Sequence, residues 1–438
     1  MKKITVIGTG YVGLVSGSGL ADFGNKVNCV DVNKKRIKDL SNGKIPFFEP
    51  GLKEIVERNK LSGRLEFNTN IAESISDSDV IFIAVWTPMA NDGSADLTAV
   101  LDVAKTIGAN ISSYTVIATK STVPIGTSKM INEVISNNIR GNTSYDLVSN
   151  PEFLREGAAV RDFLMPDRVV IGTSSQQAIE MMQEIYRPLY VNETPFVITD
   201  IPTAETIKYA SNSFLAVKIS YINELANLCD STGADIHVVA RAMGLDGRIS
   251  PKFLHPGPGF GGSCFPKDTR ALVKTAELNG LKLKVLAAAI NANETQIEVI
   301  FKKLTKLLEN NLSGKRIAIL GLAFKANTDD IRESRALILI DQLLSYEVEV
   351  VVYDPAAMKN MKKDYPNLSY AESVDDAAKG SNAIVIMTDW NEFRSLDLSG
   401  IGDLMIDKII LDAKNLLSHE ELIANGFIFE GVGRPYEY

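Results

Sequence analysis

A glycine-rich turn directly after the first apolar run constrains the fold of this chain more than any other feature. Residues 3–7 lead into Gly8-Thr9-Gly10-Tyr11-Val12-Gly13, which matches G-x-G-x-x-G, and the next apolar run, residues 26–30, ends at Asp31. Glycines permit a tight turn and let backbone N–H groups approach a pyrophosphate at a helix N-terminus. A strand, this turn, a helix and a strand ending in an acid predict a dinucleotide-binding α/β unit. A glycine-rich turn that binds nothing is the alternative.

Asp31 also bears on the choice of cofactor. A carboxylate at this position accepts hydrogen bonds from ribose hydroxyls and repels a 2′-phosphate. We therefore predict NAD rather than NADP, bound by Gly8, Gly10, Gly13 and Asp31.

Short apolar runs alternate with helical stretches in both halves of the chain. Further runs occupy residues 80–85 and 115–118 in the first half and residues 315–320, 350–353 and 383–387 in the second. Such alternation predicts parallel sheets covered by helices on both faces. The second set repeats the order of strand, glycine turn, strand and acid, which is a weak internal repeat. It lacks Gly-x-Gly, so we expect it not to cradle a pyrophosphate in the same way.

The middle of the chain carries one long helical pattern. Apolar residues recur at threes and fours over residues 203–231, with Thr203 as the expected N-cap and Gly233 after the expected end. A helix of this length can bridge two α/β domains or pair two subunits. The predicted fold is α/β, with two Rossmann-like doubly wound domains joined by a long-helix central domain. The expected domains are residues 1–200 (NAD-binding), 201–310 (central helical and dimerisation) and 311–438 (second α/β domain).

Composition narrows the classes of function. The chain has 438 residues, a formal net charge of −8, three histidines outside any suggestive motif and three cysteines. An acidic balance argues against a nucleic-acid partner, and no apolar run approaches the roughly 18–20 residues of a membrane span. Three cysteines do not favour a disulfide framework, so we expect a cytoplasmic protein with reduced thiols. We predict no metal site.

A second glycine-rich segment surrounds a cysteine. Residues 256–268 read PGPGFGGSCFPKD, and Cys264 stands just before an expected helix. A lone cysteine is more often a small buried hydrophobe, and we keep that interpretation for Cys29 and Cys229. Dense glycines leave backbone open to a ligand, and a helix N-terminus together with Lys267 favours a thiolate. We therefore interpret Cys264 as a nucleophile.

Three polar residues accompany this cysteine at helical spacing. Asp268 follows Cys264 by one helical turn, and Lys208 and Asn212 have the same spacing on the long helix. An ammonium and an amide on one helix face suit the stabilisation of an oxyanion. A solvated helix face is the alternative for Lys208 and Asn212.

Together these motifs resemble the UDP-glucose 6-dehydrogenase family, within the UDP-glucose/GDP-mannose dehydrogenase superfamily. The resemblance covers nearly the whole chain, and six spaced motifs in one order are far more specific than any single motif. The matching segments are the Gly8–Gly13 fingerprint, Lys120–Pro124, Asn150–Gly157, Glu205–Asn212, Gly259–Asp268, and Gly321–Lys325 with Arg332–Ser334.

The resemblance implies an NAD-dependent, four-electron oxidation of UDP-glucose to UDP-glucuronate. The primary alcohol gives an aldehyde, Cys264 adds to it as a thiohemiacetal, a second hydride transfer leaves a thioester, and water releases the acid. The family pattern assigns oxyanion stabilisation to Lys208 and Asn212, movement of water or a proton to Asp268, and holding of the catalytic water to Glu152 and Thr122.

The resemblance also implies further binding residues and a subunit contact. Those expected at the cofactor are Tyr11, Val12, Arg36, Thr87, Thr122, Glu156 and Arg332. Those expected at the UDP-sugar are Glu152, Phe153, Leu154, Lys208, Asn212, Phe253, Phe260, Gly261, Phe324, Lys325 and Lys414, with the UDP moiety held by the C-terminal α/β domain. Arg248 matches an arginine that reaches into the neighbouring subunit's site, which implies a homodimer or a higher homo-oligomer.

Three positions depart from the family pattern. Lys414 stands where the family commonly has arginine, and a lysine keeps the charge but loses bidentate contact with phosphate. Trp86 places a bulky ring where the family usually has a small or polar residue beside the cofactor. Pro266 replaces a residue that varies, and no weight is attached to it.

Other interpretations stay open. Sister dehydrogenases acting on GDP-mannose or on a UDP-N-acetylhexosamine share the fingerprint, the lysine and the cysteine, but the Phe after Cys264 and the run at residues 153–156 favour UDP-glucose. A non-catalytic nucleotide-sugar-binding protein is expected to lose the nucleophile or the oxyanion pair. A two-electron dehydrogenase of the 6-phosphogluconate type needs neither Cys264 nor a third domain.

Overall fold

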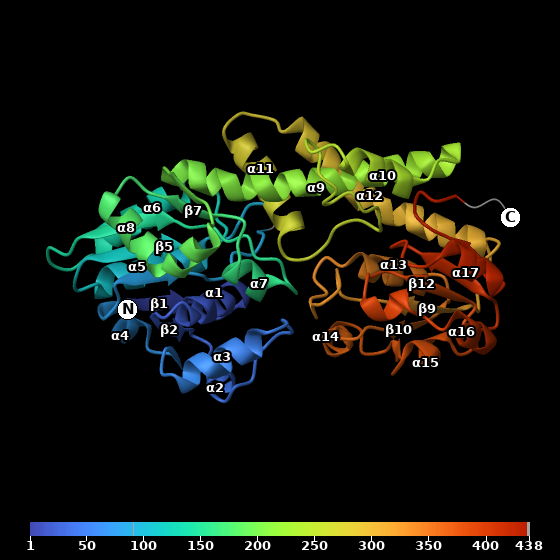
Figure 1. Cartoon of the computed structure of the whole chain (residues 1–438), viewed down its shortest axis with the longest axis horizontal. Coiled ribbons are helices and arrows are strands. Elements are labelled where there is room, and N and C mark those ends of the chain that lie inside the picture. Colours follow the sequence, from blue (N-terminus) through green and yellow to red (C-terminus); the bar gives the residue numbers. More distant parts are fainter. Residues whose placement is uncertain (91, 436–438) are drawn as a thin grey trace. The chain divides into compact units, whose positions relative to one another are not determined.

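The computed structural model describes residues 1–90 and 92–435. The chain forms two compact units (Figure 1). The N-terminal unit comprises Met1–Ser211 and Arg270–Leu281, and the C-terminal unit comprises Asn212–Thr269 and Lys282–Tyr438. Each unit is built around one parallel or largely parallel sheet.

An eight-stranded sheet forms the centre of the N-terminal unit. Its order is β3-β2-β1-β4-β5-β6-β7-β8, with β7 antiparallel to β6. The first six strands therefore have the 3-2-1-4-5-6 order of a doubly wound dinucleotide-binding fold. The strands are β1 (Lys3–Ile7), β2 (Lys26–Val30), β3 (Leu65–Asn68), β4 (Val80–Ile83), β5 (Thr115–Thr119), β6 (Tyr145–Ser149), β7 (Val169–Gly172) and β8 (Phe196–Thr199).

Helices cover both faces of this sheet, as its continuous apolar strands require. One face packs against residues of α1, α3, α7 and α8, among them Leu14 and Phe163, and the other against α4, α5 and α6, among them Ile107 and Ile131. The helices are α1 (Tyr11–Asp22), α2 (Lys34–Ser41), α3 (Leu52–Leu61), α4 (Ile71–Ser76), α5 (Thr98–Asn110), α6 (Thr127–Asn138), α7 (Ala159–Leu164), α8 (Gln176–Ile185) and the 3₁₀ helix η1 (Arg187–Asn192).

The C-terminal unit repeats this topology. Its six-stranded parallel sheet has the order β11-β10-β9-β12-β13-β14, which is again 3-2-1-4-5-6 by position in the chain. The internal repeat predicted from the sequence is therefore confirmed in the strand order. The strands are β9 (Arg316–Leu320), β10 (Glu349–Tyr353), β11 (Ser369–Tyr370), β12 (Ala383–Ile386), β13 (Ile409–Asp412) and β14 (Ile428–Glu430).

Two apolar layers also sandwich the second sheet. One layer contains residues of α9, α12 and α13, among them Ile222, Ile300 and Leu339, and the other contains residues of α15, α16 and α17, among them Ile401 and Leu422. The helices are α10 (Ile236–Gly244), α12 (Lys284–Leu307), α13 (Arg335–Leu344), α14 (Met358–Asp364), α15 (Val374–Ala378), α16 (Leu398–Leu404), α17 (His419–Ala424) and the 3₁₀ helix η2 (Asn391–Arg394).

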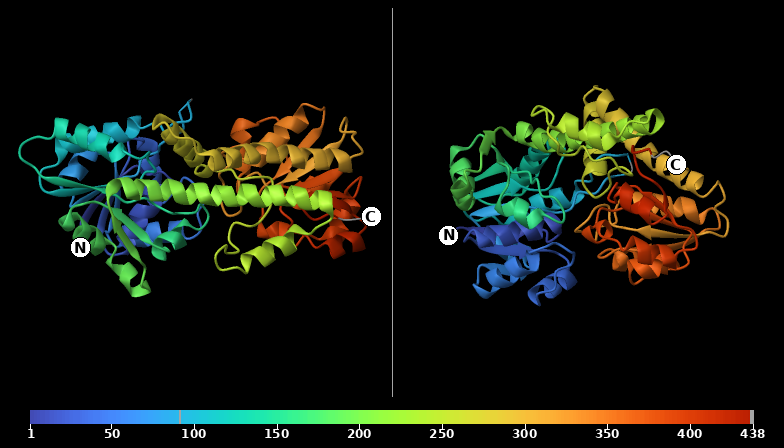
Figure 2. Two further views of the ribbon diagram at one scale, coloured as in Figure 1. Left: turned by 90° about the horizontal axis from the view of Figure 1, so that it is seen from above. Right: turned by 45° about the vertical axis from the view of Figure 1, so that its right-hand side comes forward.

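The long helix α9 (Ile201–Thr232) is unbroken (Figure 2), about 48 Å long at 1.5 Å per residue. It begins two residues before the predicted N-cap, so the prediction of Thr203 as N-cap is wrong. The Asp200 carboxylate instead accepts a hydrogen bond from Thr203 N at 2.7 Å, as an N-cap residue does. Gly233 ends the helix as predicted, with φ of +77°.

The predicted fold class is confirmed: two doubly wound α/β sheets and a helical middle are present. The three domain boundaries given above stay a prediction. In the described part of the chain, no helix is long and apolar enough to span a membrane.

Candidate functional site

The glycine fingerprint occupies the turn between β1 and α1. Gly8 has φ of +103°, and a Cβ added at Gly13 would lie 1.9 Å from the Gly8 carbonyl oxygen. Gly10 has open space where a Cβ would stand, and it is the N-cap of α1, with no side chain to cap the first turn. The turn is therefore closely packed on its inner side and open at the positive end of the helix dipole.

Asp31 lies beside this turn, at the carboxyl end of β2. Its Oδ2 accepts hydrogen bonds from Thr9 N at 2.9 Å and Thr9 Oγ1 at 2.8 Å, and Arg36 lies 3.4 Å away. Burial alone raises the pKa of this carboxyl, but hydrogen bonds from Asn33 N and Thr9 and the charge of Arg36 outweigh burial and lower it. An ionised acid next to a glycine cradle fits the ribose and pyrophosphate of a dinucleotide.

Other residues expected at the cofactor gather at the same edge of the sheet. Thr87 Oγ1 donates to the carbonyl of Thr122 at 2.9 Å, which joins the segments after β4 and β5. Glu156 is buried, and Val12 is partly exposed. Trp86, one of the departures from the family pattern, is 66% exposed and therefore fills no core position.

Glu49, a buried acid to which the sequence analysis assigned no role, links several segments at this edge of the sheet. Glu49 accepts hydrogen bonds from Gly157 N at 2.6 Å, from Ala159 N at 2.8 Å and from the Tyr11 hydroxyl. Burial first, then Glu49, raises the pKa of Tyr11. The signal in the sequence is an acid within the otherwise apolar run of residues 46–50, and the sequence does not reveal its partners.

Glu152 and Lys208 form a buried ion pair in the N-terminal unit. Lys208 Nζ lies 3.0 Å from Glu152 Oε1, and each side chain is 4% exposed. Glu152 Oε2 accepts from Leu154 N at 2.5 Å, and the centroid of the Phe153 ring lies 5.4 Å from Lys208 Nζ and 3.4 Å from the guanidinium of Arg168. The solvated-face alternative for Lys208 is therefore wrong.

Lys120 is a second buried lysine near this pair, and the sequence analysis assigned it no role. Lys120 Nζ donates to Asn150 Oδ1 at 3.0 Å and to the Tyr186 hydroxyl at 3.2 Å. Burial lowers the pKa of Lys120 to about 8, with Glu152 opposing and Lys208 adding to this shift. Asn150 stands two residues before Glu152, so Lys120 fixes the strand end that carries the catalytic candidate.

In the C-terminal unit, Cys264 immediately precedes α11 (Phe265–Leu278), as predicted. Its carbonyl accepts from Asp268 N at 2.8 Å, which places Cys264 at the N-cap position. Cys264 is partly exposed, and its Sγ lies 3.6 Å from Ser263 Oγ. Cys29 and Cys229 are buried, and burial raises the pKa of both thiols, so they keep the interpretation of small hydrophobes.

Asp268 is the fully buried centre of this region. Its carboxylate accepts from Asn212 Nδ2 at 2.7 Å and pairs with Lys267 Nζ at 2.7 Å. Asn212 is buried, so the solvated-face alternative is wrong for it as well. Lys267 was expected to favour the thiolate directly, but its ammonium is paired with Asp268, and the N-terminus of α11 also contributes positive potential at Cys264.

Residues expected at the UDP-sugar surround the glycine-rich segment of the same unit. Phe253 and Phe260 pack their rings 6.1 and 5.9 Å from that of Phe265. A Cβ added at Gly261 would lie 2.2 Å from the Glu333 carbonyl and 3.3 Å from Phe324. The segment therefore packs closely against the residues that follow β9.

The charged residues expected at the UDP-sugar have local partners. Lys414 Nζ lies 3.8 Å from Asp389 Oδ1, and its charge lowers the pKa of Asp389. Lys325 is partly buried, with its ammonium 5.5 Å from the centroid of Phe324. Arg332, expected at the cofactor, pairs with Asp330 at 2.5 Å, and its role toward NAD stays a prediction.

Phe253 and Arg248 belong to a loop that is held by Lys218, a lysine to which the sequence analysis assigned no role. Phe253 has φ of +64°, a conformation that bulky residues rarely adopt. Lys218 Nζ donates to the carbonyls of Ile249 at 3.0 Å and Lys252 at 2.5 Å. Arg248 itself is exposed and pairs with Asp246, so it points away from the core of its own unit.

The second sheet has its own acid in the position of Asp31. Asp354 follows β10 and accepts hydrogen bonds from the backbone N–H groups of Leu322, Ala323, Ala356 and Ala357 and from Trp390 Nε1. Asp354 is buried and its carboxylate already accepts hydrogen bonds from these five donors, so we do not expect it to bind a ribose. This agrees with the expectation that the second copy does not cradle a pyrophosphate as the first does.

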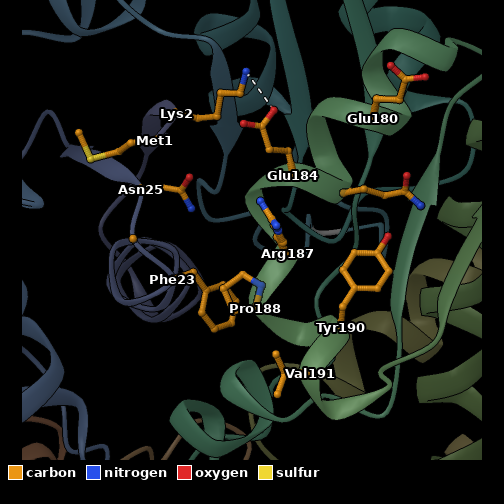
Figure 3. Close-up of a pocket in the computed structure, with 12 residues that line it drawn as sticks. Met1, Lys2, Phe23, Asn25, Glu180, Glu184, Arg187, Pro188, Tyr190 and Val191 are labelled. Atoms are coloured by element: carbon orange, nitrogen blue, oxygen red, sulfur yellow. Dashed lines mark ion pairs between the residues drawn. The ribbon is translucent and has the colours of Figure 1, made fainter.

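A surface hollow of about 810 Å³ lies elsewhere in the N-terminal unit (Figure 3). Its lining includes the ion pair of Lys2 and Glu184 at 3.1 Å, with Phe23, Asn25 and Arg187 around it. Lys2 and Asn25 precede β1 and β2, so the hollow is at the amino ends of these strands. Ligands of doubly wound sheets bind at the carboxyl ends, and the hollow is not a candidate for the cofactor.

We expect Asp31→Asn to relax the preference for NAD⁺ over NADP⁺ by about tenfold or more, because the carboxylate's repulsion of a 2′-phosphate is removed. Fluorescence titration of the two reduced cofactors measures this ratio. Asp39→Asn, which changes a partly exposed acid paired with Lys35, is the control. An unchanged ratio in Asp31→Asn contradicts its role as the ribose ligand.

Lys120→Met should change how stability depends on pH. The folded protein binds the Lys120 proton more weakly than the unfolded chain, with a pKa of about 8 against 10.5. The resulting penalty on folding is complete below pH 8 and is lost as pH rises through 10.5. The free energy of unfolding of the wild type, relative to Lys120→Met, should therefore increase between pH 8 and pH 10 in urea titrations. The exposed-lysine variant Lys105→Met should show no such trend, and a flat difference for Lys120→Met refutes the assignment.

Comparison with known proteins gives the family. Sequence models of the UDP-glucose/GDP-mannose dehydrogenase family match over residues 2–190 for its NAD binding domain, 202–295 for its central domain and 318–419 for its UDP binding domain. The first match confirms NAD as the cofactor, and the third supports a UDP-sugar as the substrate.

Individual relatives agree with these matches. The UDP-glucose 6-dehydrogenase of Rhizobium meliloti is 47% identical over 99% of this chain and 100% of its own, and UDP-glucose 6-dehydrogenase TuaD of Bacillus subtilis is 46% identical over 99% and 94%. The solved UDP-glucose dehydrogenase of Pyrobaculum islandicum has a TM-score of 0.92 at 36% identity, covering 99% and 98%. This chain belongs to the UDP-glucose/GDP-mannose dehydrogenase family.

Proposed function

We propose that this chain oxidises UDP-glucose to UDP-glucuronate in two NAD⁺-dependent steps, with Cys264 as the covalent nucleophile. The observation that carries the proposal is a partly exposed thiol at the N-cap of α11, one turn before a buried carboxylate held by an amide and an ammonium. Relatives named UDP-glucose 6-dehydrogenase, 41–47% identical over nearly the full chain, support the choice of sugar nucleotide.

Bound NAD⁺ supplies the acceptor for one hydride in each oxidation. In the first step, the C6 alcohol loses a hydride and a proton and becomes an aldehyde. Glu152 and Thr122 are proposed to hold the water that takes part in proton removal, and the ion pair with Lys208 fixes the Glu152 side chain.

Covalent addition turns the aldehyde into a species that can lose a second hydride. The Cys264 thiolate adds to the aldehyde carbon and forms a thiohemiacetal oxyanion. The Lys208 ammonium and the Asn212 amide, one helical turn apart on α9, are suited to stabilise that oxyanion. Loss of the second hydride then leaves a thioester on Cys264.

Hydrolysis completes the reaction. Water adds to the thioester carbon, Asp268 assists proton movement, and the carbon–sulfur bond breaks to give the acid and the free thiol. Per sugar, one water enters, and two hydrides and three protons leave, so that the alcohol becomes a carboxylate. Holding the aldehyde on sulfur explains why it need not leave before the second oxidation.

The C-terminal unit is proposed to hold the UDP moiety. Lys325 and Lys414 are suited to the diphosphate as point charges. The saturated Asp354 keeps this second sheet from binding a dinucleotide as the first sheet does. Lys414, unlike an arginine, cannot contact a phosphate through two parallel hydrogen bonds. Its ion pair with Asp389 further limits the affinity for the diphosphate that it can contribute.

We further propose that the chain forms a homodimer through α9. Phe214, Tyr221 and Leu228 recur every seven residues on this helix and are 64%, 50% and 57% exposed. A repeated apolar stripe of this kind is typical of paired helices. The exposed Arg248 is then free to reach a second copy.

Limiting UDP-glucose with excess NAD⁺ tests the reaction directly. We expect two NADH per sugar, measured by absorbance, and no acid from Cys264→Ala, because the thiol acts only in the acyl-transfer steps. NAD⁺ should still bind to that variant, and Cys229→Ala should behave as the wild type. One NADH per sugar, or acid formed at an unchanged rate by Cys264→Ala, contradicts covalent catalysis. No NADH at all redirects the search to GDP-mannose and the UDP-N-acetylhexosamines.

The double variant Phe214→Asp/Tyr221→Asp should shift the protein toward monomer, because two charges then face the apolar stripe. Light scattering after size-exclusion chromatography measures the mass. Leu61→Asp, at a site on α3 that is 89% exposed, is the control and should keep the wild-type mass. A wild-type mass in the double variant refutes pairing through α9.

A further inference from the structure

The segment that leads to Cys264 has no regular secondary structure, so its buried backbone groups need other partners. Gly257, Phe260 and Gly261 are buried and lie outside every helix and strand. Unpaired backbone N–H and C=O groups in such positions cost free energy comparable to a lost hydrogen bond. Side chains from α9 and α12 supply the partners.

Asn293 of α12 pairs with both backbone groups of one residue. Its Oδ1 accepts from Phe260 N at 2.7 Å, and its Nδ2 donates to Phe260 O at 3.1 Å. Arg335 Nε also donates to Phe260 O, at 2.9 Å. Gly259, with φ of +108°, permits this approach, because a Cβ there would lie 2.7 Å from Asn293 Oδ1.

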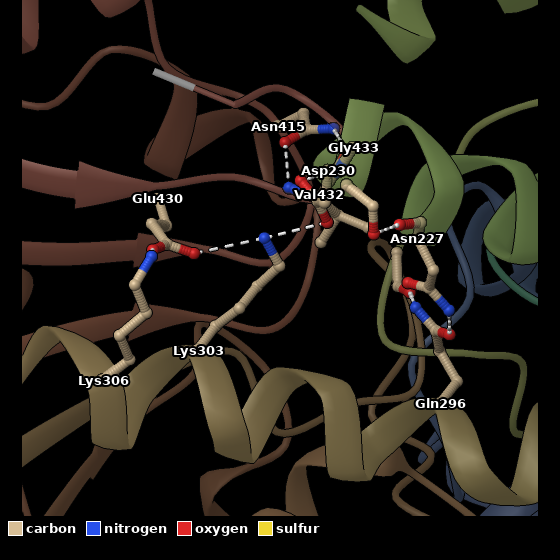
Figure 4. A network of polar contacts seen from close by, with 11 residues as sticks. Asn227, Asp230, Gln296, Lys303, Lys306, Asn415, Glu430, Val432 and Gly433 are labelled. Atoms are coloured by element: carbon tan, nitrogen blue, oxygen red, sulfur yellow. Dashed lines mark hydrogen bonds and ion pairs between the residues drawn. The ribbon is translucent and has the colours of Figure 1, made fainter. Parts of the chain in front are cut away.

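Two more buried amides hold Gly257. Asn223 Oδ1 of α9 accepts from Gly257 N at 2.8 Å, and Gln296 Nε2 of α12 donates to Gly257 O at 3.2 Å. Gln296 Oε1 in turn accepts from Asn227 Nδ2 at 3.0 Å, and this pair links the two helices (Figure 4).

The same two helices are joined to the end of the sheet nearby. Lys303 of α12 pairs with Asp230 of α9 at 2.9 Å and with Glu430 of β14 at 3.2 Å (Figure 4). Asp230 also accepts from Gly433 N at 3.1 Å. The amides therefore project from a frame that is itself fixed by ion pairs.

Cys264 lies between two such anchors. Asn293 holds the backbone four residues before it, and Asn212 holds the Asp268 carboxylate four residues after it. A displacement of the thiol by about 1 Å is enough to cost a large factor in rate.

We propose that Asn293, with Asn223 and Gln296, is a positioning residue that places Cys264 for attack by holding the backbone of Gly257 and Phe260. The proposal rests on the function proposed above, since it concerns the same nucleophile. It assigns these amides no contact with substrate or cofactor.

The test compares full-length wild type, Asn293→Leu, Asn293→Asp and the exposed control Asn291→Leu on the same helix. Hydrogen exchange of peptides covering residues 256–263 reports the anchor, and iodoacetamide alkylation of Cys264 reports the thiol without any substrate. Steady-state kinetics with UDP-glucose and NAD⁺ separate kcat from KM.

For Asn293→Leu we expect exchange in residues 256–263 to be about tenfold faster and kcat to fall by about tenfold or more. The KM for NAD⁺ should stay unchanged within about twofold. Alkylation of Cys264 should slow, because the thiol moves away from the N-terminus of α11. Asn293→Asp keeps the acceptor for Phe260 N and should retain more kcat. Asn291→Leu should match the wild type in all three measurements.

Three results overturn the proposal. They are a fall in kcat without faster exchange in residues 256–263, faster exchange with kcat and alkylation unchanged, or equal losses in Asn293→Leu and Asn291→Leu. If the wild type produces no NADH from UDP-glucose, the proposed function fails. Exchange and alkylation then still decide whether Asn293 places the thiol.

Discussion

One carboxylate at the end of the second strand organises each of the two sheets in this chain. In both sheets it accepts a backbone N–H from the residue after the first glycine, Thr9 for Asp31 and Leu322 for Asp354. The two acids differ in how many hydrogen-bond donors each carboxylate accepts from. Asp354 receives four backbone N–H groups and an indole N–H, whereas Asp31 receives two backbone N–H groups, one hydroxyl and a partly exposed arginine. The same turn therefore leaves Asp31 with fewer hydrogen-bond donors than Asp354, as expected if only the first copy binds a ribose.

The buried charges of the N-terminal unit lose their hydration on folding and need partners that compensate for that loss. Taking an ammonium and a carboxylate out of water is repaid only with good geometry and further hydrogen bonds. Glu152 and Lys208 meet this condition through Leu154 N and the Phe153 ring, and Lys120 meets it through Asn150 and Tyr186. Such an arrangement is typical of a site that must present charge to a reaction in a dry setting.

The sequence predicted those features whose cause is local. Apolar runs, the G-x-G-x-x-G turn and the N-cap position of Cys264 follow from neighbouring residues, and the structure has them. The helical pattern put the N-cap of α9 at Thr203, although Asp200, two residues before Pro202, is a start signal that the sequence also contains. Glu49, Lys218 and Asn293 could not be found, because their partners lie far from them in the sequence, and a polar residue does not by itself reveal what it faces.

The electrostatics of Cys264 depend on how completely Asp268 is neutralised. A bare carboxylate one turn from a thiol opposes formation of the thiolate. Here Lys267 and Asn212 both bind that carboxylate, at 2.7 Å each, so the pair of Lys267 and Asp268 contributes little net charge. The helix dipole of α11 then acts on Cys264 with little opposition from Asp268. Lys267 thus favours the nucleophile indirectly, by cancelling its negative neighbour, and the anchors at Phe260 and Asp268 keep the thiol at the helix end where that potential is strongest.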